Sequence, residues 1–365
     1  MNFFYTHISS EAKEYVNRVL DTTFISAGKI AEQFEKELER ILKLNQVVTV
    51  NSGTSALHLG LDIAGIKEGD EVIIPAQTFI ATGLSVLMLK AVPVFADIQP
   101  DTGNIDPVSI EKKITSRTKA IIPVHWGGYP CDMDEINAIA SNYKLKVIED
   151  AAHAVGASYK GDSIGTISDF TAFSFQAIKH LTTGDGGALC CKETKDYLGA
   201  KHKRWFGIDR ENSKPSILGE REYDVSESGY KYHLNDYAAA LGLANLNDIP
   251  AILNRHRFIA NIYSKDLANI PGLTLLNYKS DRQSSYWIFT ILVEKREDFI
   301  RKLASHGIPS SVVHLRIDSN SVFGGIRKDL LNQEKFNELQ VSIPVHSGLM
   351  DEDIKNIIET IKSGW

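Results

Sequence analysis

The sequence predicts an α/β protein in which a large α/β/α domain, built on a mostly parallel sheet, precedes a small carboxyl-terminal α+β domain. From about residue 45, short apolar runs alternate with segments of helical period, which is typical of such a sheet with helices on both faces. The chain has 365 residues, too many for one ordinary hydrophobic core, and its pattern changes near residues 245–255. We therefore expect a large domain over residues 1–248 and a small domain over residues 249–365, with about the first 20 residues able to pack on the small domain.

Strand and helix signals alternate along the large domain. The expected strands are the runs QVVTV, EVIIP, VPVFAD, KAIIPVHW, KVIEDAAH, DFTAFSF and GGALCCK. Helices are expected after QVVTV, near residues 78–90, after Cys131, and from Asn235–Asp236 onward. In the small domain, an α+β unit is indicated by SSYWIFTILVE, REDFIRKLASHG, IPSSVVH and EDIKNIIETIKSG, the last with an apolar stripe at Ile354, Ile357, Ile358 and Ile361.

Composition and charge disfavour several classes of protein. Hydrophobic residues make up 43% and charged residues 24%, which indicates a globular chain. The net charge of −6, without a long basic run, argues against nucleic acid as a partner. The three cysteines, Cys131, Cys190 and Cys191, show neither a disulfide framework nor the spacing of a metal site. The sequence has no signal-peptide pattern and no apolar run long enough to span a membrane, so we expect a soluble, cytoplasmic protein without a metal.

A turn suited to phosphate follows the first expected strand. In VTVNSGTSALHLGL, a helix is expected to begin near Thr54, where free backbone N–H groups and the helix dipole attract an anion. Gly53 allows close approach of the backbone, and Thr54 adds a hydroxyl. The alternative is an ordinary helix cap formed by Asn51 or Ser52.

A carboxylate and a histidine follow the expected strand KVIE. Ligands of open α/β sheets collect beyond the carboxyl ends of the strands, where Asp150 lies. A buried carboxylate needs a cationic partner, and a protonated pyridine nitrogen is one. His153 lies close enough in sequence to face the same pocket. Alternatively, Asp150 caps the next turn and His153 is a satisfied core histidine.

The segment FSFQAIKHLTTGDGG places Lys179 between a strand and a run of Thr and Gly. A lysine becomes nucleophilic when its ammonium form is destabilised or when it is held as a Schiff base. Ser174 ends the preceding strand and could bind a phosphate. The alternative is an exposed loop lysine followed by an ordinary Asp185-Gly186 turn. A phosphate turn, a carboxylate and a lysine, each at a strand end, together fit pyridoxal phosphate (PLP).

These segments resemble the DegT/StrS family of sugar aminotransferases, within the fold-type I PLP enzymes. The resemblance covers almost the whole chain and includes NSGTSALHLGL, IPAQTFIAT, PVHWGG, IEDAAHAVGA, SFQAIKHLTTGDGG, GYKYHLNDYAAALGLANL and VSIPVHSGLMDEDI. It implies transfer of an amino group from an amino acid, expected to be L-glutamate, to a nucleotide-linked keto sugar in deoxyamino-sugar or surface-polysaccharide biosynthesis. Two alternatives stay open: the same chemistry on a small phosphorylated ketone, and a non-catalytic PLP-binding regulator. A dinucleotide-binding reductase is disfavoured, because no Gly-x-Gly-x-x-Gly follows the first strand.

The resemblance also implies how the cofactor is held. Gly53, Thr54 and Ser174 would bind its phosphate, and Phe79 would stack on its pyridine ring. The alternative for Phe79 is simple core packing.

For the reacting groups, the resemblance implies that Asp150 pairs with the ring nitrogen and that His153 lies near the ring hydroxyl. Lys179 would form the Schiff base with the cofactor. Some family members carry His at the lysine position and catalyse deoxygenation, which Lys179 argues against.

The segment GYKYHLND departs from the family. The family reads Gly-Tyr-Asn-Tyr-Arg there, and its Asn reaches the phosphate of a partner subunit. This chain has Lys231 in place of the Asn and His233 in place of the Arg. A lysine can still serve an anion as a point charge, so we expect a homodimer with active sites at the interface and Lys231 among the cofactor-binding residues.

Cations beyond the cofactor segments are candidates for binding an anionic substrate. KHKRWFGIDR contains Arg204, and VVHLRIDSNSVFGG contains His314 and Arg316. They could bind the phosphate groups of the keto substrate, or they could form a solvated basic face.

Overall fold

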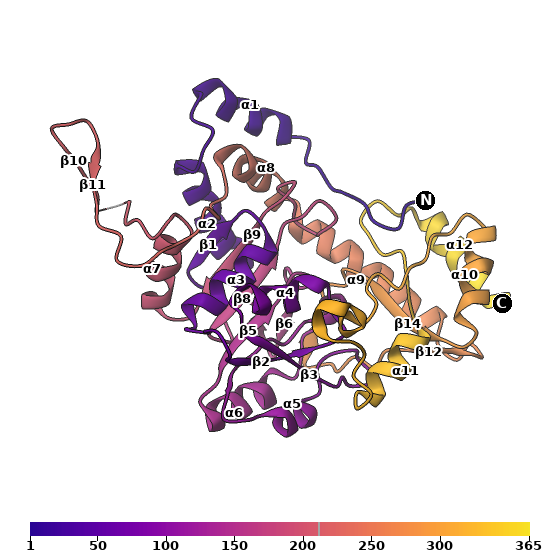
Figure 1. The fold of residues 1–365 in the computed structure, drawn as a ribbon. Coiled ribbons are helices and arrows are strands. Elements are labelled where there is room, and N and C mark those ends of the chain that lie inside the picture. Colours follow the sequence, from indigo (N-terminus) through magenta and orange to yellow (C-terminus); the bar gives the residue numbers. More distant parts are fainter. Residues whose placement is uncertain (211) are drawn as a thin grey trace.

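The structure, a computed structural model, describes residues 1–210 and 212–365 and is centred on a seven-stranded sheet (Figure 1). The strand order is β1-β9-β8-β5-β4-β2-β3. β9 runs antiparallel to both of its neighbours, and the other pairings are parallel. The predicted mostly parallel sheet is thus confirmed, with strands Val47–Val50 (β1), Glu71–Pro75 (β2), Val92–Ala96 (β3), Thr118–Ile121 (β4), Lys146–Asp150 (β5), Phe170–Ser174 (β8) and Gly187–Cys191 (β9).

Helices cover both faces of this sheet, because alternate strand residues point to opposite sides. Val47 and Ile73 pack with α2, α5, α6 and α8, whereas Val48 and Ile74 pack with α3, α4 and α7. No helix among the described residues combines the length and the apolar character needed to cross a membrane. The helices up to this point of the chain are Ala12–Thr22 (α1), Lys29–Leu42 (α2), Gly53–Ile63 (α3), Ile80–Met88 (α4), Pro107–Lys113 (α5), Met133–Tyr143 (α6), Thr194–Lys203 (α7) and Asp236–Leu246 (α8).

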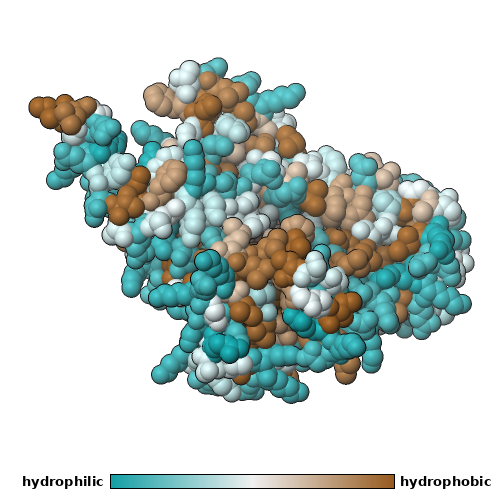
Figure 2. Space-filling view, viewed as in Figure 1, coloured by the Kyte–Doolittle hydropathy of each residue, from teal (hydrophilic) through white to brown (hydrophobic). Residues whose placement is uncertain are grey.

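A hairpin of two short strands, Lys214–Pro215 (β10) and Arg221–Glu222 (β11), projects away from the body of the molecule (Figure 1). Its tip is apolar, as the brown surface in Figure 2 shows, and Ile217 and Leu218 there are almost completely exposed. Exposed apolar residues on a projecting element indicate an interaction surface.

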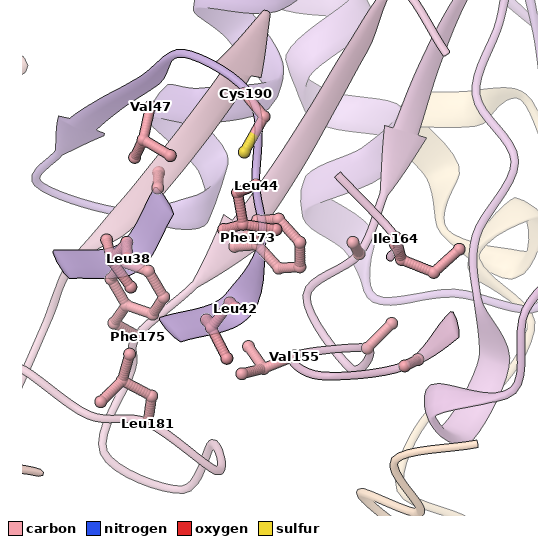
Figure 3. Packing of buried hydrophobic residues seen from close by; sticks show 14 of the residues in the cluster. Leu38, Leu42, Leu44, Val47, Val155, Ile164, Phe173, Phe175, Leu181 and Cys190 are labelled. Carbon is pink, nitrogen blue, oxygen red and sulfur yellow. The ribbon is translucent and has the colours of Figure 1, made fainter. Parts of the chain in front are cut away.

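The core on one face of the sheet is densely packed (Figure 3). Phe173 of β8 and Cys190 of β9 belong to the same buried cluster as Leu38 and Leu42 of α2. All three cysteines are buried, and none of them forms a disulfide. This packing fixes the sheet that carries the expected site residues at its edge.

The carboxyl-terminal part is built on a smaller antiparallel sheet of order β12-β14-β15. The predicted stripe on its last helix is buried. In IPSSVVH, Ser311 pairs with Ser342 by a single bridge and no full strand forms. The elements are Ile249–Asp266 (α9), Leu273–Leu275 (β12), Phe289–Val293 (β14), Arg296–Ser305 (α10), Leu331–Leu339 (α11), Gln340–Ile343 (β15) and Asp351–Lys362 (α12), with short 3-10 turns at Ile317–Ser319 and Ser321–Phe323. Another 3-10 turn, at Trp126–Gly128, belongs to the large part.

The two parts are closely joined, and the division at residue 248 stays a prediction. Within α9, Leu253 packs in the core of the large part and Tyr263 in that of the small part. Phe323, far along the chain, packs back onto the core of the large part. At the amino terminus, Tyr5 stacks on His346, whereas α1 packs along α8.

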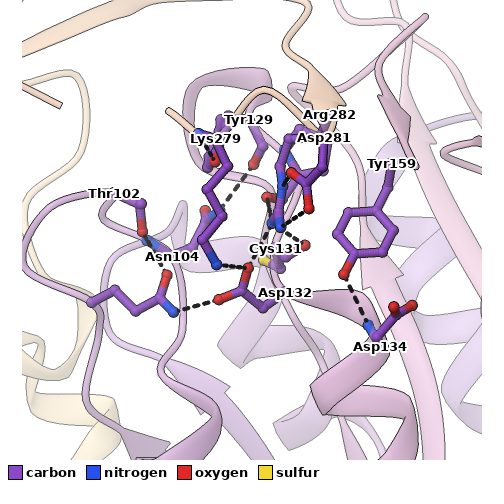
Figure 4. Close-up of polar contacts among 12 residues, drawn as sticks. Thr102, Asn104, Tyr129, Cys131, Asp132, Asp134, Tyr159, Lys279, Asp281 and Arg282 are labelled. Atoms are coloured by element: carbon purple, nitrogen blue, oxygen red, sulfur yellow. Dashed lines mark hydrogen bonds and ion pairs between the residues drawn. The ribbon is translucent and has the colours of Figure 1, made fainter. Parts of the chain in front are cut away.

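A buried polar network ties residues 278–283 to the large part of the molecule (Figure 4). The side chain of Arg282 is 2% exposed and lies 2.7 Å from Asp132. It also donates to the carbonyl oxygen of Cys131 and lies over the rings of Tyr129 and Tyr159. A small sheet formed by Ser158–Tyr159 (β6), Asp162–Ser163 (β7) and Arg282–Gln283 (β13) reinforces this junction.

Candidate active site

A cavity of about 360 Å³ lies at the carboxyl edge of the parallel strands. The segments that follow β1, β2, β4, β5 and β8 all reach it, and residues from the carboxyl-terminal part close it. Its lining residues include Gly53, Thr54, Phe79, Asp150, His153, Ser174, Lys179, Trp287 and His314. The structure therefore brings most of the predicted site residues into one space.

The start of α3 forms one end of this cavity. Ser52 caps the helix by accepting a hydrogen bond from the backbone N–H of Ser55 at 3.0 Å, so the capping interpretation also holds. The helix approaches β8 so closely that a Cβ atom on Gly53 would lie 2.9 Å from Cβ of Ser174. The first backbone N–H groups of the helix and the hydroxyls of Thr54 and Ser174 are hydrogen-bond donors of the kind that binds a phosphate, and we call this group the phosphate cradle.

Asp150 ends β5 with its carboxylate at the cavity wall, 5% exposed. Its Oδ2 accepts a hydrogen bond from Thr82 Oγ1 at 2.7 Å, and its Oδ1 accepts one from the backbone N–H of Ala152 at 3.2 Å. The second bond is the predicted turn cap, but it leaves lone pairs of the carboxylate for a further donor. Burial raises the pKa of Asp150, and the bond from Thr82 opposes that change. A protonated ring nitrogen would supply the missing cationic partner.

Lys179 is half-buried, and it lines the cavity where an ordinary loop lysine would face solvent. Its Nζ lies 3.5 Å from the centre of the Trp287 ring. Burial lowers the pKa of Lys179 to about 7, while the charge of Asp150 acts in the opposite direction. Near neutral pH, Lys179 is therefore a free amine in a large fraction of the protein molecules, and the free amine is the form that attacks an aldehyde.

His153 is buried and stacks on Trp287, with ring centres 3.9 Å apart and planes at 18°. Burial lowers the pKa of His153 well below its ordinary range, so the ring is neutral. Its Nδ1 has no hydrogen-bond partner among the described residues, which is unlike a satisfied core histidine. A polar group of a ligand in the cavity, such as the ring hydroxyl of PLP, would provide that partner.

Phe79 and His314 form another wall of the cavity. Phe79 is 53% exposed, so its ring is not a core residue, and it lies 5.2 Å from the ring of His314. Burial lowers the pKa of His314 to about 4, and its Nε2 has no partner among the described residues. Val313 has a φ of 58°, a left-handed conformation that β-branched residues avoid, so the loop is strained where it presents His314.

The structure places Arg204 and Arg316 away from the predicted cofactor residues. Neither residue lines the cavity that contains Lys179. The guanidinium of Arg204 pairs with the buried carboxylate of Glu35. That of Arg316 is buried between Asp318, at 2.7 Å, and Glu334. Both charges are paired with carboxylates of the same chain, and the predicted role of these two residues in substrate binding stays a prediction.

Lys231 is exposed and does not line the cavity of its own chain, so its predicted role stays a prediction. Its Nζ lies 6.0 Å from the ring centre of Trp205, and Arg210 lies 5.0 Å from the same ring. His233 also contacts Trp205, and burial with the nearby cations lowers its pKa to about 4.

Sequence reasoning did not single out Thr82 or place Trp287 in the site. Thr82 lies outside the cavity lining and acts on it only through Asp150. Trp287 reaches the cavity because its backbone N–H donates to the carbonyl oxygen of Gly127 at 2.8 Å. No local sequence signal marks either position.

The model of the DegT/DnrJ/EryC1/StrS aminotransferase family matches residues 6–362. The chain belongs to this family. It is 34% identical to the GDP-perosamine synthase of Escherichia coli O157:H7, over 97% of this chain and 95% of that protein. The sugar aminotransferase CalS13 of Micromonospora echinospora superposes with a TM-score of 0.95 at 33% identity, covering 100% of both chains. The Spr1654 protein of Streptococcus pneumoniae, solved in a PLP form, superposes with a TM-score of 0.92 at 30% identity, covering 100% of this chain and 98% of the other.

Family membership confirms the predicted fold-type I architecture, the PLP cofactor and the aminotransferase activity. The protein is an enzyme, a PLP-dependent sugar aminotransferase. The cavity fits this cofactor on its own geometry, through the phosphate cradle at Gly53, the carboxylate of Asp150 and the unpartnered nitrogen of His153.

Proposed function

We propose that this enzyme transfers the amino group of L-glutamate to a keto sugar linked to a nucleotide, in the biosynthesis of a deoxyamino sugar for a surface polysaccharide. The observation that carries the chemistry is the meeting of Lys179, Asp150 and the Gly53 turn around one cavity. The nucleotide is supported by the name of the GDP-perosamine synthase relative. A cytoplasmic location is part of the same proposal.

Each cavity residue has a distinct task in this proposal. Bound PLP supplies an aldehyde for Lys179 and a ring that accepts the electron pair left when the donor loses its α-proton. Phe79 positions the ring by stacking, and Asp150 keeps the ring nitrogen protonated. The amine of Lys179, once released, carries the proton from the donor α-carbon to C4′ of the cofactor, for which a pKa of about 7 is well matched.

The overall exchange occurs in two halves at the same site. In the first half, PLP held by these residues would supply the chemistry by which the amino acid gives up its amino group and departs as a 2-oxo acid. In the second half, the ketone of the sugar receives that amino group, and its oxygen is the one lost. In the second half, Lys179 would move a proton in the opposite direction, from C4′ to the sugar carbon that receives the amino group. The same residue thus acts as base and then as acid.

We further propose a homodimer in which Lys231 serves the cofactor phosphate of the partner subunit. Lys231 is exposed and lies outside its own cavity, together with Arg210 beside Trp205. The apolar hairpin tip at Ile217 and Leu218 projects from the same chain region and would be covered by a second copy (Figures 1 and 2). These exposed cations would also attract a nucleotide diphosphate.

The test loads the purified protein with PLP and fixes the cofactor with borohydride, which should label the peptide that contains Lys179. The aminated form is then offered nucleotide-linked keto sugars and small keto phosphates, and the return of the aldehyde absorbance is followed. We expect turnover with a nucleotide-linked ketone and competition by nucleoside diphosphates. If nucleotides have no effect while a small keto phosphate reacts, the smaller substrate replaces this one. Labelling of another lysine would remove the assignment of Lys179.

A further inference from the structure

Two buried threonine hydroxyls, one just before α4 and one in its first turn, are linked by hydrogen bonds in series to the carboxylate of Asp150. Thr78 Oγ1 lies 2.7 Å from Thr82 Oγ1, and Thr82 Oγ1 lies 2.7 Å from Asp150 Oδ2. Thr82 is 0% exposed and Thr78 is 1% exposed. Water does not compete for these bonds, so the chain of hydroxyls has a defined arrangement.

The direction of donation follows from the charge of the carboxylate. An ionised carboxylate only accepts hydrogen bonds, so the hydroxyl of Thr82 donates to Asp150. The oxygen of Thr82 is then free to accept the hydroxyl proton of Thr78. Hydrogen bonds in such a chain polarise one another and strengthen the last donation, which is the one that reaches Asp150.

We propose that Thr82 is a positioning residue that keeps Asp150 ionised and turned toward the cofactor ring nitrogen, with Thr78 orienting the Thr82 hydroxyl. The inference rests on the proposed pairing of Asp150 with that nitrogen. Thr82 itself does not line the cavity, so it acts only through the carboxylate.

The surroundings of Asp150 show why such a donor is needed. Burial raises the pKa of Asp150, and the Thr82 bond is the largest opposing influence. The other groups that favour the ionised form are the Ala152 N–H, Lys179 after β8 and His125 after β4. Lys179 is no longer a free ammonium group when it is joined to the cofactor, whereas the Thr82 hydroxyl is unchanged by that reaction.

The same turn of α4 also sets the ring wall. Phe79 is the residue that precedes the helix, and the backbone N–H of Thr82 donates to its carbonyl oxygen at 3.2 Å. One helical turn therefore places both the aromatic face and the donor to Asp150. Ser85, one turn further, offers a matched control, because its buried hydroxyl donates to the carbonyl oxygen of Thr82 and not to Asp150.

The test compares Thr82→Val, which keeps the shape and removes the hydroxyl, with Thr82→Ser and Ser85→Ala. In the PLP-loaded protein we expect Thr82→Val to lower kcat by about tenfold, which corresponds to about 1.4 kcal/mol, with little change in KM and a smaller loss of cofactor affinity. The pH dependence of the cofactor absorbance should shift with it. Thr82→Ser should restore wild-type behaviour, and Ser85→Ala should match the wild type.

A second readout needs no cofactor. In the apoprotein, trace acetylation of Lys179 across a pH series gives the pKa of its amine. Because the charge of Asp150 raises that pKa, Thr82→Val should lower it, and Thr82→Ser should not. If the substitutions acted only by disturbing the packing around position 82, the pKa of the Lys179 amine would change in the same way in both variants.

The outcomes separate this inference from the proposed function. If Thr82→Val keeps the wild-type affinity, pH profile and Lys179 labelling while Asp150→Asn loses activity, the inference is wrong. If Asp150→Asn also behaves as the wild type, the role of Asp150 itself fails. Should Thr82→Val not fold, Thr78→Val removes the first link of the chain. Because Thr78 also lines the cavity, its test is the Lys179 labelling of the apoprotein, which should shift in the same direction by a smaller factor; wild-type labelling there overturns the inference.

Discussion

Lys179 should make the apoprotein less stable at neutral and acid pH, because its ammonium form is disfavoured inside the cavity. Burial lowers its pKa from 10.5 to about 7. At about 1.4 kcal/mol per pKa unit, the difference sets an upper limit of about 5 kcal/mol on this cost. Since the side chain is only half-buried and lies against Trp287, we expect roughly half of it, about 2 kcal/mol. Lys179→Met should therefore stabilise the apoprotein by about 2 kcal/mol at pH 6.

The pH dependence has a definite sign. Between about pH 7 and pH 10.5 the unfolded chain binds more protons at this position than the folded one, so the free energy of unfolding rises with pH in that window. Below about pH 7 the full cost is present, and above pH 10.5 it disappears. The gain from Lys179→Met should thus be largest at pH 6 and should shrink toward pH 10.

Urea unfolding of the two apoproteins at pH 6, 8 and 10, followed by tryptophan fluorescence, measures this difference. Lys355→Met is the control, because Lys355 is exposed on α12 and its removal should change stability by less than about 0.5 kcal/mol at every pH. A Lys179→Met protein that is no more stable than the wild type at pH 6, or whose gain does not depend on pH, would refute the reasoning.

Three further predictions test other parts of the site and the fold. Asp150→Asn should retain PLP but lose more than tenfold in kcat in a steady-state assay, a barrier increase of at least ~1.4 kcal/mol, because the ring nitrogen loses its anionic partner. Arg282→Ala should lower the free energy of unfolding in urea by about 3 kcal/mol, because it leaves buried Asp132 poorly compensated, whereas loss of the exposed pair by Arg301→Ala should cost less than about 1 kcal/mol. Lys231→Ala should weaken PLP binding, and mixing it with Lys179→Ala should restore activity if sites are shared; a monomer in sedimentation would count against this.

The sequence predicts the position of those site residues that lie at the carboxyl ends of strands. The apolar runs of β5 and β8 are short and bounded, and parallel strands end at a common edge, so strand order along the chain is enough to predict that Asp150 and Ser174 lie together. Lys179 follows β8 closely enough that its position is constrained as well.

The ion pairs of Arg204 and Arg316 depend on the fold, although one partner of Arg316, Asp318, is only two residues away. Arg204 finds Glu35 across 169 positions, and Arg316 finds Glu334 after a reversal of the chain. The sequence around a basic residue does not identify a distant carboxylate that will pair with it, because such pairing depends on tertiary packing. For the same reason the sequence does not place Trp287 in the cavity, where backbone pairing with Gly127 and the hydrogen bond from its indole N–H to the carbonyl oxygen of Ile178 hold it.

The ionisation states around the cavity explain why a cationic ring belongs there. Burial keeps His153 and His314 neutral, and it leaves Lys179 only partly charged. Asp150 is the buried carboxylate of the cavity wall, and neutral imidazoles cannot balance its charge. Once Lys179 has joined the cofactor, a proton on the ring nitrogen is the cation that can compensate Asp150 directly. The environment that raises the pKa of Asp150 in the absence of the ring therefore favours the protonated ring when it is bound, and this is the form that accepts the electron pair in transamination.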